Sequence, residues 1–483
     1  MTTFTRRNML RTTGLTLAAA ALPRAEVFAQ APGPVMVTLS TYMAAAAERD
    51  LPPDVLEHVK LHVLDTIAAM VSGTELAPGK AALRYAQAYG GKGTATVVGS
   101  RLLAGPVDAA LANGVLAHSD ETDDSHGPSQ SHPGAGVVSA ALAAGEEFGV
   151  SGMRFMRAVA LGYDVGTRVT IALGGSDFRY QSYKSTHAIA GAFGAAAAAA
   201  SAAGLTAQQM RWLFDYAAQQ SSGIGSWGRD VDHIEKGFVF GGMPARSGVT
   251  SALLVKLGWN GVDDVFTGDS NFFMAYAPNG KPDLLIEGLG TRYEVVRTDI
   301  KKWTVGTPIQ APLDAVELAR QKHPFEADQV KEVVVRLAPD VAAVVDNRDI
   351  PDICVQHMIA VMLIDKTASF KAAHDKARMQ DATVLKHRAK VRLAKDASLD
   401  AFLPIRVAIV EVTLTDGTRL SERVDAVRGT VRNPMTRKEV VDKARDLMAP
   451  ILGAGKTDRL IEAIFALDGL ANIRALRPLL QPA

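Results

Sequence analysis

The sequence of 483 residues contains a single cysteine, few aromatic residues and almost no net charge. Cys354 by itself cannot form a disulfide within the chain or a cluster of thiolates around a metal. The balance of 52 Lys and Arg against 51 Asp and Glu provides no electrostatic basis for binding nucleic acid or an anionic membrane. Apolar residues make up 48%, too many for a disordered chain, whereas aromatic residues are scarce at 6% and Ala and Gly abound. The composition favours a helical enzyme over a β-rich binding module.

The first 31 residues have the three parts of a bacterial export signal. Arg6 and Arg7 form a twin-arginine pair, residues 14–22 are apolar, and a small residue suited to cleavage follows at Ala29. The apolar stretch is too short to span a bilayer. We therefore predict a twin-arginine signal peptide over 1–31 and a periplasmic protein that leaves the membrane once the signal is removed. An ordinary amphipathic helix is the alternative.

Most of the first half of the mature chain is predicted to be helical. Apolar residues recur at three- and four-residue spacing, with Gly or Pro near the borders, in 53–72, 105–116, 134–148 and 152–173. The segment 187–204 consists almost entirely of Ala and Gly. Because such small side chains permit close backbone approach, we predict a helix buried among other helices rather than a membrane span.

After about residue 268 the sequence pattern changes from helical to mixed. Residues alternate with the two-residue period of strands in 293–297, 330–337 and 405–414. The segment Thr415-Asp-Gly-Thr418 separates two alternating runs and is typical of a hairpin turn. Helical patterns lie between the predicted strands at 310–322 and 354–364.

The order of these patterns predicts the domain organisation. A helical pattern resumes after the capping-box spacing of Thr436 and Glu439. We predict a mainly α protein with a large discontinuous all-helical domain, formed by residues 32–274 and 431–483. A smaller α+β lid domain is predicted over 275–430.

Residues 118–132, between two predicted helices, concentrate three of the eleven histidines and four carboxylates. These residues are His118, Asp120, Glu121, Asp123, Asp124, His126 and His132. Histidine transfers protons near neutral pH and neighbouring carboxylates shift one another's pKa, so the segment suits acid/base catalysis. A solvated polar loop is a second interpretation. A metal site is a third, with His118, Asp120, His126 and His132 as ligands.

Two further polar clusters lie downstream. His187 is at the start of the Ala-rich segment, where the positive end of a helix dipole favours a neutral imidazole and attracts anions. Lys184 lies just before it, and Lys236 and Arg246 form part of the next cluster. Such cations hold substrate carboxylates, Arg in a bidentate manner. A structural histidine and surface charges are the alternative interpretations.

Together the three clusters resemble the MmgE/PrpD family. Its signature resembles Asn113–His126 followed by Ser131-His132-Pro133, and supporting segments follow in the family's order at 162–168, 186–196, 217–225, 236–248 and 432–436. The resemblance implies a mostly helical major domain, a smaller α+β lid domain and a homodimer. It also implies cofactor-free chemistry on a small di- or tricarboxylate in the cleft between the domains. Members include 2-methylcitrate dehydratase, cis-aconitate decarboxylase and iminodisuccinate epimerase.

The resemblance also assigns roles to single residues. His132, His187 and Lys236 match two histidines and a lysine of the family's active site. Ser125 stands where the family usually has a threonine, and Glu121 where it has an aspartate.

We therefore predict a lyase of the dehydratase type that works by acid/base chemistry at the carbon α to a carboxylate. His132 or His187 would be the base and Glu121 or Asp124 the acid. The predicted catalytic residues are His132, His187, Glu121, Asp124, Ser125 and Lys236. The predicted substrate-binding residues are His118, Asp120, Lys184 and Arg246, and no metal or cofactor is expected. An epimerase, an isomerase or a decarboxylase on the same scaffold, a periplasmic metal-dependent hydrolase and a non-catalytic carboxylate binder are the alternatives.

Overall fold

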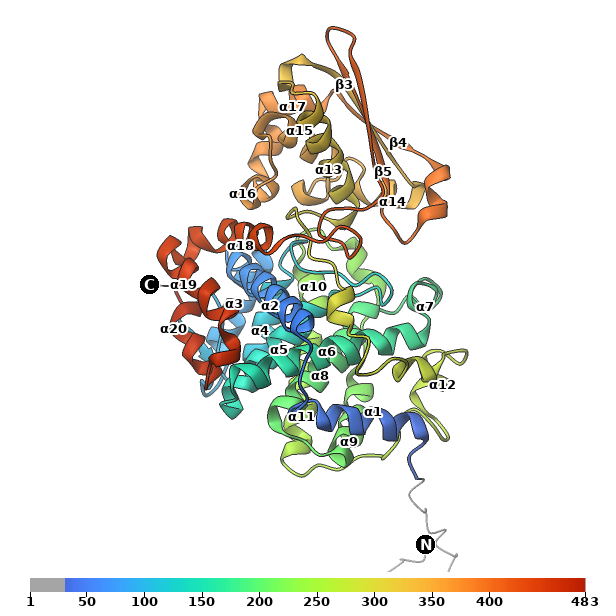
Figure 1. Cartoon of the computed structure of the whole chain (residues 1–483), viewed down its shortest axis with the longest axis vertical. Helices are drawn as coiled ribbons and strands as arrows, with labels where there is room; N and C mark the ends of the chain where they lie inside the picture. The colour runs from blue at the N-terminus through green and yellow to red at the C-terminus, as the bar shows by residue number, and fades with distance from the viewer. Residues whose placement is uncertain (1–30, 483) are drawn as a thin grey trace, which may run out of the picture.

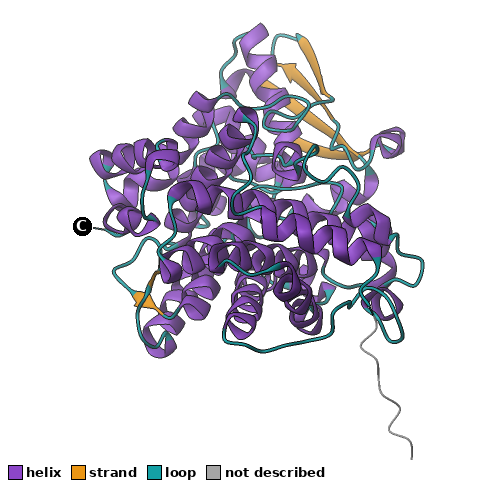
Figure 2. Cartoon of the chain, turned by 60° about the horizontal axis from the view of Figure 1, so that its bottom comes forward, coloured by secondary structure: helices purple, strands orange, loops and turns teal. Residues whose placement is uncertain are grey.

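A computed structural model describes residues 31–482 and shows a mainly α-helical molecule, as predicted (Figures 1 and 2). Two hydrophobic cores organise it. The larger contains residues between 35 and 300 together with residues between 440 and 480, and the smaller lies between Trp303 and Val427. Most of the predicted signal peptide, residues 1–30, lies outside the described residues.

Helices from both ends of the chain build the part around the larger core. They are α1 Pro34–Ala45, α2 Pro53–Gly73, α3 Ala77–Tyr89, α4 Pro106–Ala117, α5 Pro133–Phe148, α6 Gly152–Leu173, α7 Gly175–Ser182, α8 Thr186–Ala203, α9 Ala207–Gln220, α10 Ile234–Gly237, α11 Met243–Lys256, α12 Phe272–Tyr276, α18 Arg437–Leu452, α19 Ala454–Phe465 and α20 Arg477–Leu480. The short strands β1 Ala95–Thr96 and β2 Leu103–Ala104 pair with each other, so this part is not purely helical. Figure 1 shows α18 beside α2, which brings the end of the chain against its beginning.

The Ala-rich helix α8 is buried along its whole length against α5, α6 and α11, in agreement with the predicted buried helix. A Cβ on Gly166 of α6 would lie only 2.9 Å from the Cα of Gly194 in α8, so these backbones meet more closely than side chains would allow. Thr186–Ala203 and Ile234–Lys256 are long and apolar enough to cross a membrane, a test that buried core helices also pass.

A four-stranded sheet covered by helices forms the smaller part, at the top of Figure 1. Its elements are α13 Thr307–Lys322, β3 Val330–Leu337, α14 Pro339–Val345, α15 Val355–Asp365, α16 Phe370–His374, α17 Ala382–Arg388, β4 Val391–Lys395, β5 Ala408–Leu414 and β6 Arg419–Val424. The strand order is β4-β3-β5-β6, with β3 and β4 parallel and the other pairs antiparallel. The predicted hairpin joins β5 to β6, and Gly417 in its turn has a φ of 93°.

Two local expectations require revision. The predicted strand at 293–297 is wrong, because Glu294–Arg297 forms a short 3-10 helix. The Glu294 side chain is buried there, and its backbone N–H donates to the Asp164 carboxylate at 2.7 Å. Residues as late as Ile300 belong to the larger core, so the smaller core begins later than the predicted lid boundary at 275.

Candidate active site

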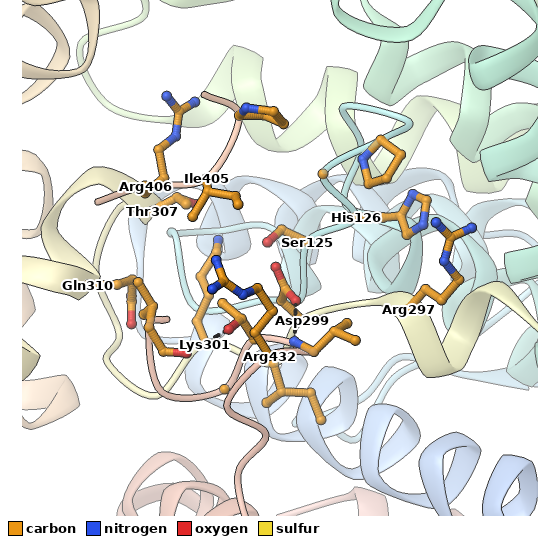
Figure 3. Close-up of a pocket in the computed structure, with 18 of the residues that line it drawn as sticks. Ser125, His126, Arg297, Asp299, Lys301, Thr307, Gln310, Ile405, Arg406 and Arg432 are labelled. Atoms are coloured by element: carbon orange, nitrogen blue, oxygen red, sulfur yellow. Dashed lines mark hydrogen bonds between the residues drawn. The ribbon is translucent and has the colours of Figure 1, made fainter. Parts of the chain in front are cut away.

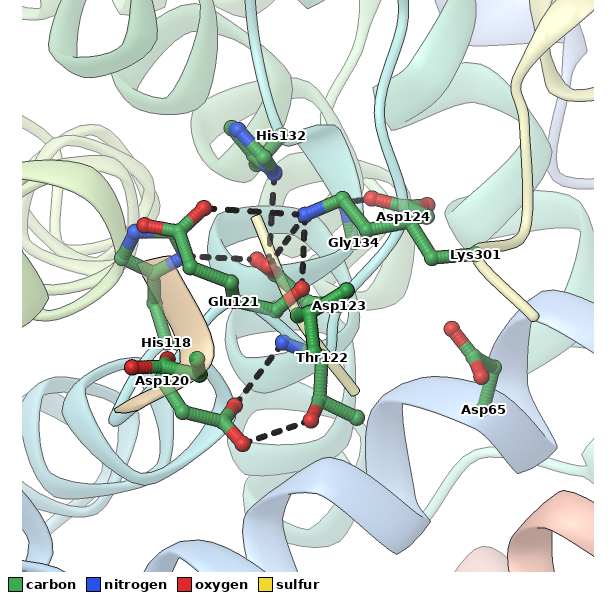
Figure 4. A network of polar contacts seen from close by, with 12 residues as sticks. Asp65, His118, Asp120, Glu121, Thr122, Asp123, Asp124, His132, Gly134 and Lys301 are labelled. Atoms are coloured by element: carbon green, nitrogen blue, oxygen red, sulfur yellow. Dashed lines mark hydrogen bonds and ion pairs between the residues drawn. The ribbon is translucent and has the colours of Figure 1, made fainter. Parts of the chain in front are cut away.

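The segment 118–132 links α4 to α5 and is buried, so its interpretation as a solvated polar loop is wrong. Asp123 is its electrostatic centre (Figure 4). One of its carboxylate oxygens lies 2.9 Å from Nδ1 of His118 and the other 3.3 Å from Nδ1 of His132. Burial alone would raise the pKa of Asp123, but the two imidazoles hold it well below its usual value. Asp123 is therefore an anion that fixes both rings.

His132 is left neutral with one ring nitrogen available. Burial lowers the pKa of His132, and the Asp123 carboxylate only partly offsets this effect. Because Nδ1 faces Asp123, Nε2 is directed away from the carboxylate. A neutral imidazole in this orientation can accept a proton at Nε2.

His187 lies in the first turn of α8, and its ring centroid is 5.1 Å from that of His132. The ring stacks on Phe240 at 3.7 Å and meets the edge of Trp227. Within residues 31–482, neither of its ring nitrogens has a hydrogen-bond partner. Burial, with the charge of Arg179 as the next cause, places the pKa of His187 well below its usual value, so it too is neutral.

Glu121 is bound by cations. Its carboxylate pairs with the ammonium of Lys236, and its second oxygen lies 3.9 Å from Nζ of Lys301. Burial raises the pKa of Glu121, yet these two lysines hold it well below its usual value. An ionised carboxylate cannot donate a proton at neutral pH, which favours a role in holding Lys236 and Lys301 in place.

Asp124 faces away from this cluster into the helical core. Its Oδ2 lies 3.0 Å from Nδ1 of His62 and accepts a hydrogen bond from the Tyr163 hydroxyl. Its Oδ1 accepts from the backbone N–H of Gly134. The last bond places the carboxylate at the N-terminus of α5, where a negative charge is stabilised. These contacts hold the loop against α2, α5 and α6.

Asp120 connects the loop to the smaller part of the molecule. Its carboxylate lies 2.9 Å from Nε2 of His374 in α16, and Asp352 lies 3.9 Å from the same nitrogen. Burial would lower the pKa of His374, but the hydrogen bond and charge of Asp120 raise it to about 9. Asp120 and His374 therefore form an ion pair at neutral pH that bridges the two cores.

A cavity of about 560 Å³ opens between the two parts (Figure 3). Ser125, His132 and His187 of the predicted site line it. Its walls are rich in cations, contributed by Arg179, Arg297, Lys301, Arg406, Arg428 and Arg432. Such a cavity suits a small substrate with several carboxylates.

The other predicted site residues lie outside the cavity wall. His118, Asp120, Glu121, Asp124 and Lys236 stand behind it in the contacts described above. Lys184 lies 3.7 Å over the ring of Tyr276, and Arg246 lies 6.0 Å over that of Phe238.

Sequence reasoning missed most of the cavity cations. Arg179, Lys301 and Arg406 come from α7, from the connection between the cores and from the segment before β5. Lys301 and Arg406 stand apart from the polar clusters of the sequence, Arg179 directly precedes the second cluster, and only the folded chain brings the three together. Arg432 was visible as part of one segment of the family resemblance, although without a role.

The four ligands of the predicted metal site do not come together. His126 lies 3.3 Å from Glu294 and 2.8 Å from Ser129. Within residues 31–482, two other groups have potential ligand atoms within 4.8 Å of one another. One consists of His118, Glu121 and His233, and the other of His118, Asp123 and His132. Lys301 lies within 4 Å of both carboxylates, so the anionic charge is already matched by an ammonium rather than free for a metal ion.

Comparisons with known proteins agree with this arrangement of two parts. The family model described as MmgE/PrpD N-terminal domain matches residues 37–285, and the one described as MmgE/PrpD C-terminal domain matches 303–468. Cis-aconitate decarboxylase of Aspergillus terreus is 24% identical over 464 residues, covering 90% of this chain and 93% of the relative. Human cis-aconitate decarboxylase is 25% identical over 450 residues, covering 88% and 90%. The chain belongs to the MmgE/PrpD family.

Proposed function

We propose that the protein is a cofactor-independent lyase that acts on a small di- or tricarboxylate in the cavity between its two parts. One observation carries the proposal: two neutral, buried histidines, His132 and His187, lie 5.1 Å apart on the wall of a cavity rich in cations. Neutral imidazoles move protons at neutral pH, and the cations hold carboxylates and stabilise negative charge as it develops.

His132 is the better-positioned base for the carbon α to a carboxylate, since Asp123 fixes its Nδ1. Proton removal from that carbon, or loss of CO₂ from it, leaves an enolate-like carbanion. Lys301 lines the cavity and donates to the backbone carbonyl of Glu121 at 2.8 Å, so its ammonium is held where it can stabilise such an anion. His187 is the second proton carrier, and the Ser125 hydroxyl is available to a leaving or incoming group.

The relatives named above are decarboxylases, so carbon–carbon cleavage is the first reaction to test. The same residues suit the dehydration predicted from the sequence, because both reactions pass through a carbanion next to a carboxylate. In decarboxylation the carbon–carbon bond breaks and CO₂ leaves. The carbanion then takes a proton from a histidine that has itself been protonated by water. In dehydration a histidine takes the proton and hydroxide leaves.

The mature protein, incubated with cis-aconitate, citrate and 2-methylcitrate in D₂O and followed by proton NMR, tests the proposal. Decarboxylation yields a product with one carboxyl group fewer, dehydration yields a new alkene, and epimerisation introduces deuterium without a change of formula. We expect decarboxylation or dehydration of at least one of the acids or a close analogue, whereas epimerisation alone would indicate an isomerase. Unchanged spectra throughout a wider panel of di- and tricarboxylates would contradict a lyase function.

The family resemblance also leads us to propose a homodimer. Light scattering of the mature protein in solution tests it, with twice the mass of one chain as the expected result.

A further inference from the structure

The cations of the cavity differ in how their charge is balanced. Arg297 lies 3.0 Å from Glu294, and Arg428 pairs with Glu439. Lys301 has two carboxylates within 4 Å. Each of these three cations therefore has at least one carboxylate of the protein within 4 Å.

Arg179 and Arg406, both half-buried in the cavity wall, are cations that lack such a carboxylate within the described chain. Among residues 31–482, no carboxylate lies within 4.0 Å of either guanidinium. Arg432 also has no such carboxylate in this range, but its side chain is exposed. The carboxylates that line the cavity are engaged elsewhere: Asp425 pairs with Arg423, and Asp299 accepts from the backbone N–H of Val431.

The polar contacts of the two arginines are few. Arg179 donates to the side-chain carbonyl of Gln130 at 3.1 Å and lies 5.4 Å from the ring of Trp227. The guanidinium of Arg406 donates no hydrogen bond to any residue in the described range 31–482. Five guanidinium donors in a fixed fork are therefore left almost entirely available on Arg406.

The two guanidiniums also influence each other. Burial lowers the pKa of Arg406, and the charge of Arg179 lowers it further. Two like charges held near each other and partly removed from water are unfavourable unless an anion is shared between them.

The position of the pair relates it to the reaction. Arg179 is the strongest charge acting on His187, which places it beside one of the proposed proton carriers. Figure 3 shows Arg406 on the side of the cavity opposite to Arg297. Arg179 belongs to the helical part and Arg406 to the smaller part, so an anion between them would be held by both.

We propose that Arg179 and Arg406 form a subsite for a third anionic group of the substrate, a carboxylate or a phosphate. This inference rests on the proposed function. It assigns the enzyme a substrate with three anionic groups rather than two. It also makes the substrate itself a bridge between the two parts of the molecule.

A matched series of non-reacting probes tests the subsite by isothermal titration calorimetry on the mature protein. The probes are succinate, 2-(carboxymethyl)succinate and 2-(phosphonomethyl)succinate, which differ only in the third group. The variants are Arg406→Gln, Arg406→Lys and Arg179→Gln. Arg392→Gln is the control, because Arg392 is an exposed arginine of the same part, 62% accessible, on β4.

We expect each Gln variant to weaken binding of one three-anion probe by roughly 10- to 100-fold, as the loss of charge-assisted hydrogen bonds predicts. Binding of succinate should change less than threefold, Arg406→Lys should lose less than Arg406→Gln, and the control should match the wild type. The probe that depends on the arginines identifies carboxylate or phosphate as the third group.

Equal losses for succinate and the three-anion probes, or no loss at all, would overturn the subsite while leaving the proposed function intact. Failure of the wild type to bind any of the three probes would instead count against both, because the proposed function requires a carboxylate ligand. Thermal unfolding of each variant shows whether the fold is retained, and Arg406→Lys keeps the test valid if Arg406→Gln does not fold.

Discussion

Asp123 contacts two imidazoles at once, because its two oxygens face Nδ1 of His118 and Nδ1 of His132. Replacing it with Asn keeps the shape and removes the charge. We expect Asp123→Asn to lower kcat by roughly 10²-fold, the lower end of what loss of an acid/base group costs. Its carboxylate raises the pKa of His132, so the variant should move the acidic limb of the pH–rate profile to lower pH.

The pH–rate profile separates this role from simple loss of structure. A variant that only destabilised the fold would lower the rate without moving the limb. Asp349→Asn, at an aspartate that is 84% accessible, is the control and should leave both the rate and the profile unchanged.

A second prediction at the residue scale concerns His374 and Asp120, which bridge the two cores. The pKa of His374 is raised from 6.5 to about 9, so the pair stabilises the fold fully below pH 6.5 and loses this contribution as the pH rises to about 9. The wild type should exceed His374→Gln in unfolding free energy by about 2 kcal/mol at pH 6. By pH 9.5 the difference should have disappeared. Urea unfolding at both values measures it, with the exposed His323→Gln as the control.

At the scale of elements, the site depends on a close approach of α4 to the π-helix Phe238–Gly242. A Cβ on Gly241 would lie 1.9 Å from the carbonyl oxygen of Gly114, so no side chain fits there. We expect Gly241→Ala to destabilise the protein by about 1–3 kcal/mol, as overpacking does. It should also lower activity, because Phe240 stacks on His187. Gly228→Ala, with nothing within 4 Å of the added Cβ, should have little effect on urea unfolding.

The elements themselves were largely predictable. The period of apolar residues predicted α6 and β3 to the residue, and the Thr436–Glu439 capping box begins α18. The strand predicted at 293–297 was wrong because the same alternation of residues also fits a short 3-10 helix. There the backbone N–H of Glu294 donates to the Asp164 carboxylate instead of to a neighbouring strand. Local periodicity contains no information about such a long-range contact.

The candidate site was predictable only in part, and the reason is again distance along the chain. His132 and His187 stand in polar clusters and begin helices, so the sequence points to them. Arg179 and Arg406 are far apart in the sequence, and they line one cavity only when the smaller part folds against the helical one. Whether Asp124 faces the cavity or the core depended on partners such as His62 that lie more than sixty residues away.

At the scale of the whole molecule, the predicted signal peptide leads us to expect a protein that is exported from the cytoplasm. We expect full-length protein to reach the periplasm of a bacterial host, and replacement of Arg6 and Arg7 by Lys to retain it in the cytoplasm. Fractionation and immunoblotting measure both, with Arg11→Lys as the matched control outside the pair. Equal distribution of the two forms would contradict export by the twin-arginine route.

The central claim is that two neutral histidines carry out proton transfer in a cationic cavity shared by the two parts of the molecule. The most direct test is kcat/KM of His132→Ala and His187→Ala on the substrate found by the NMR screen, beside His323→Ala as an exposed control. The account predicts losses of roughly 10²- to 10⁴-fold for the two cavity histidines and none for the control. Wild-type rates in both cavity variants would contradict it.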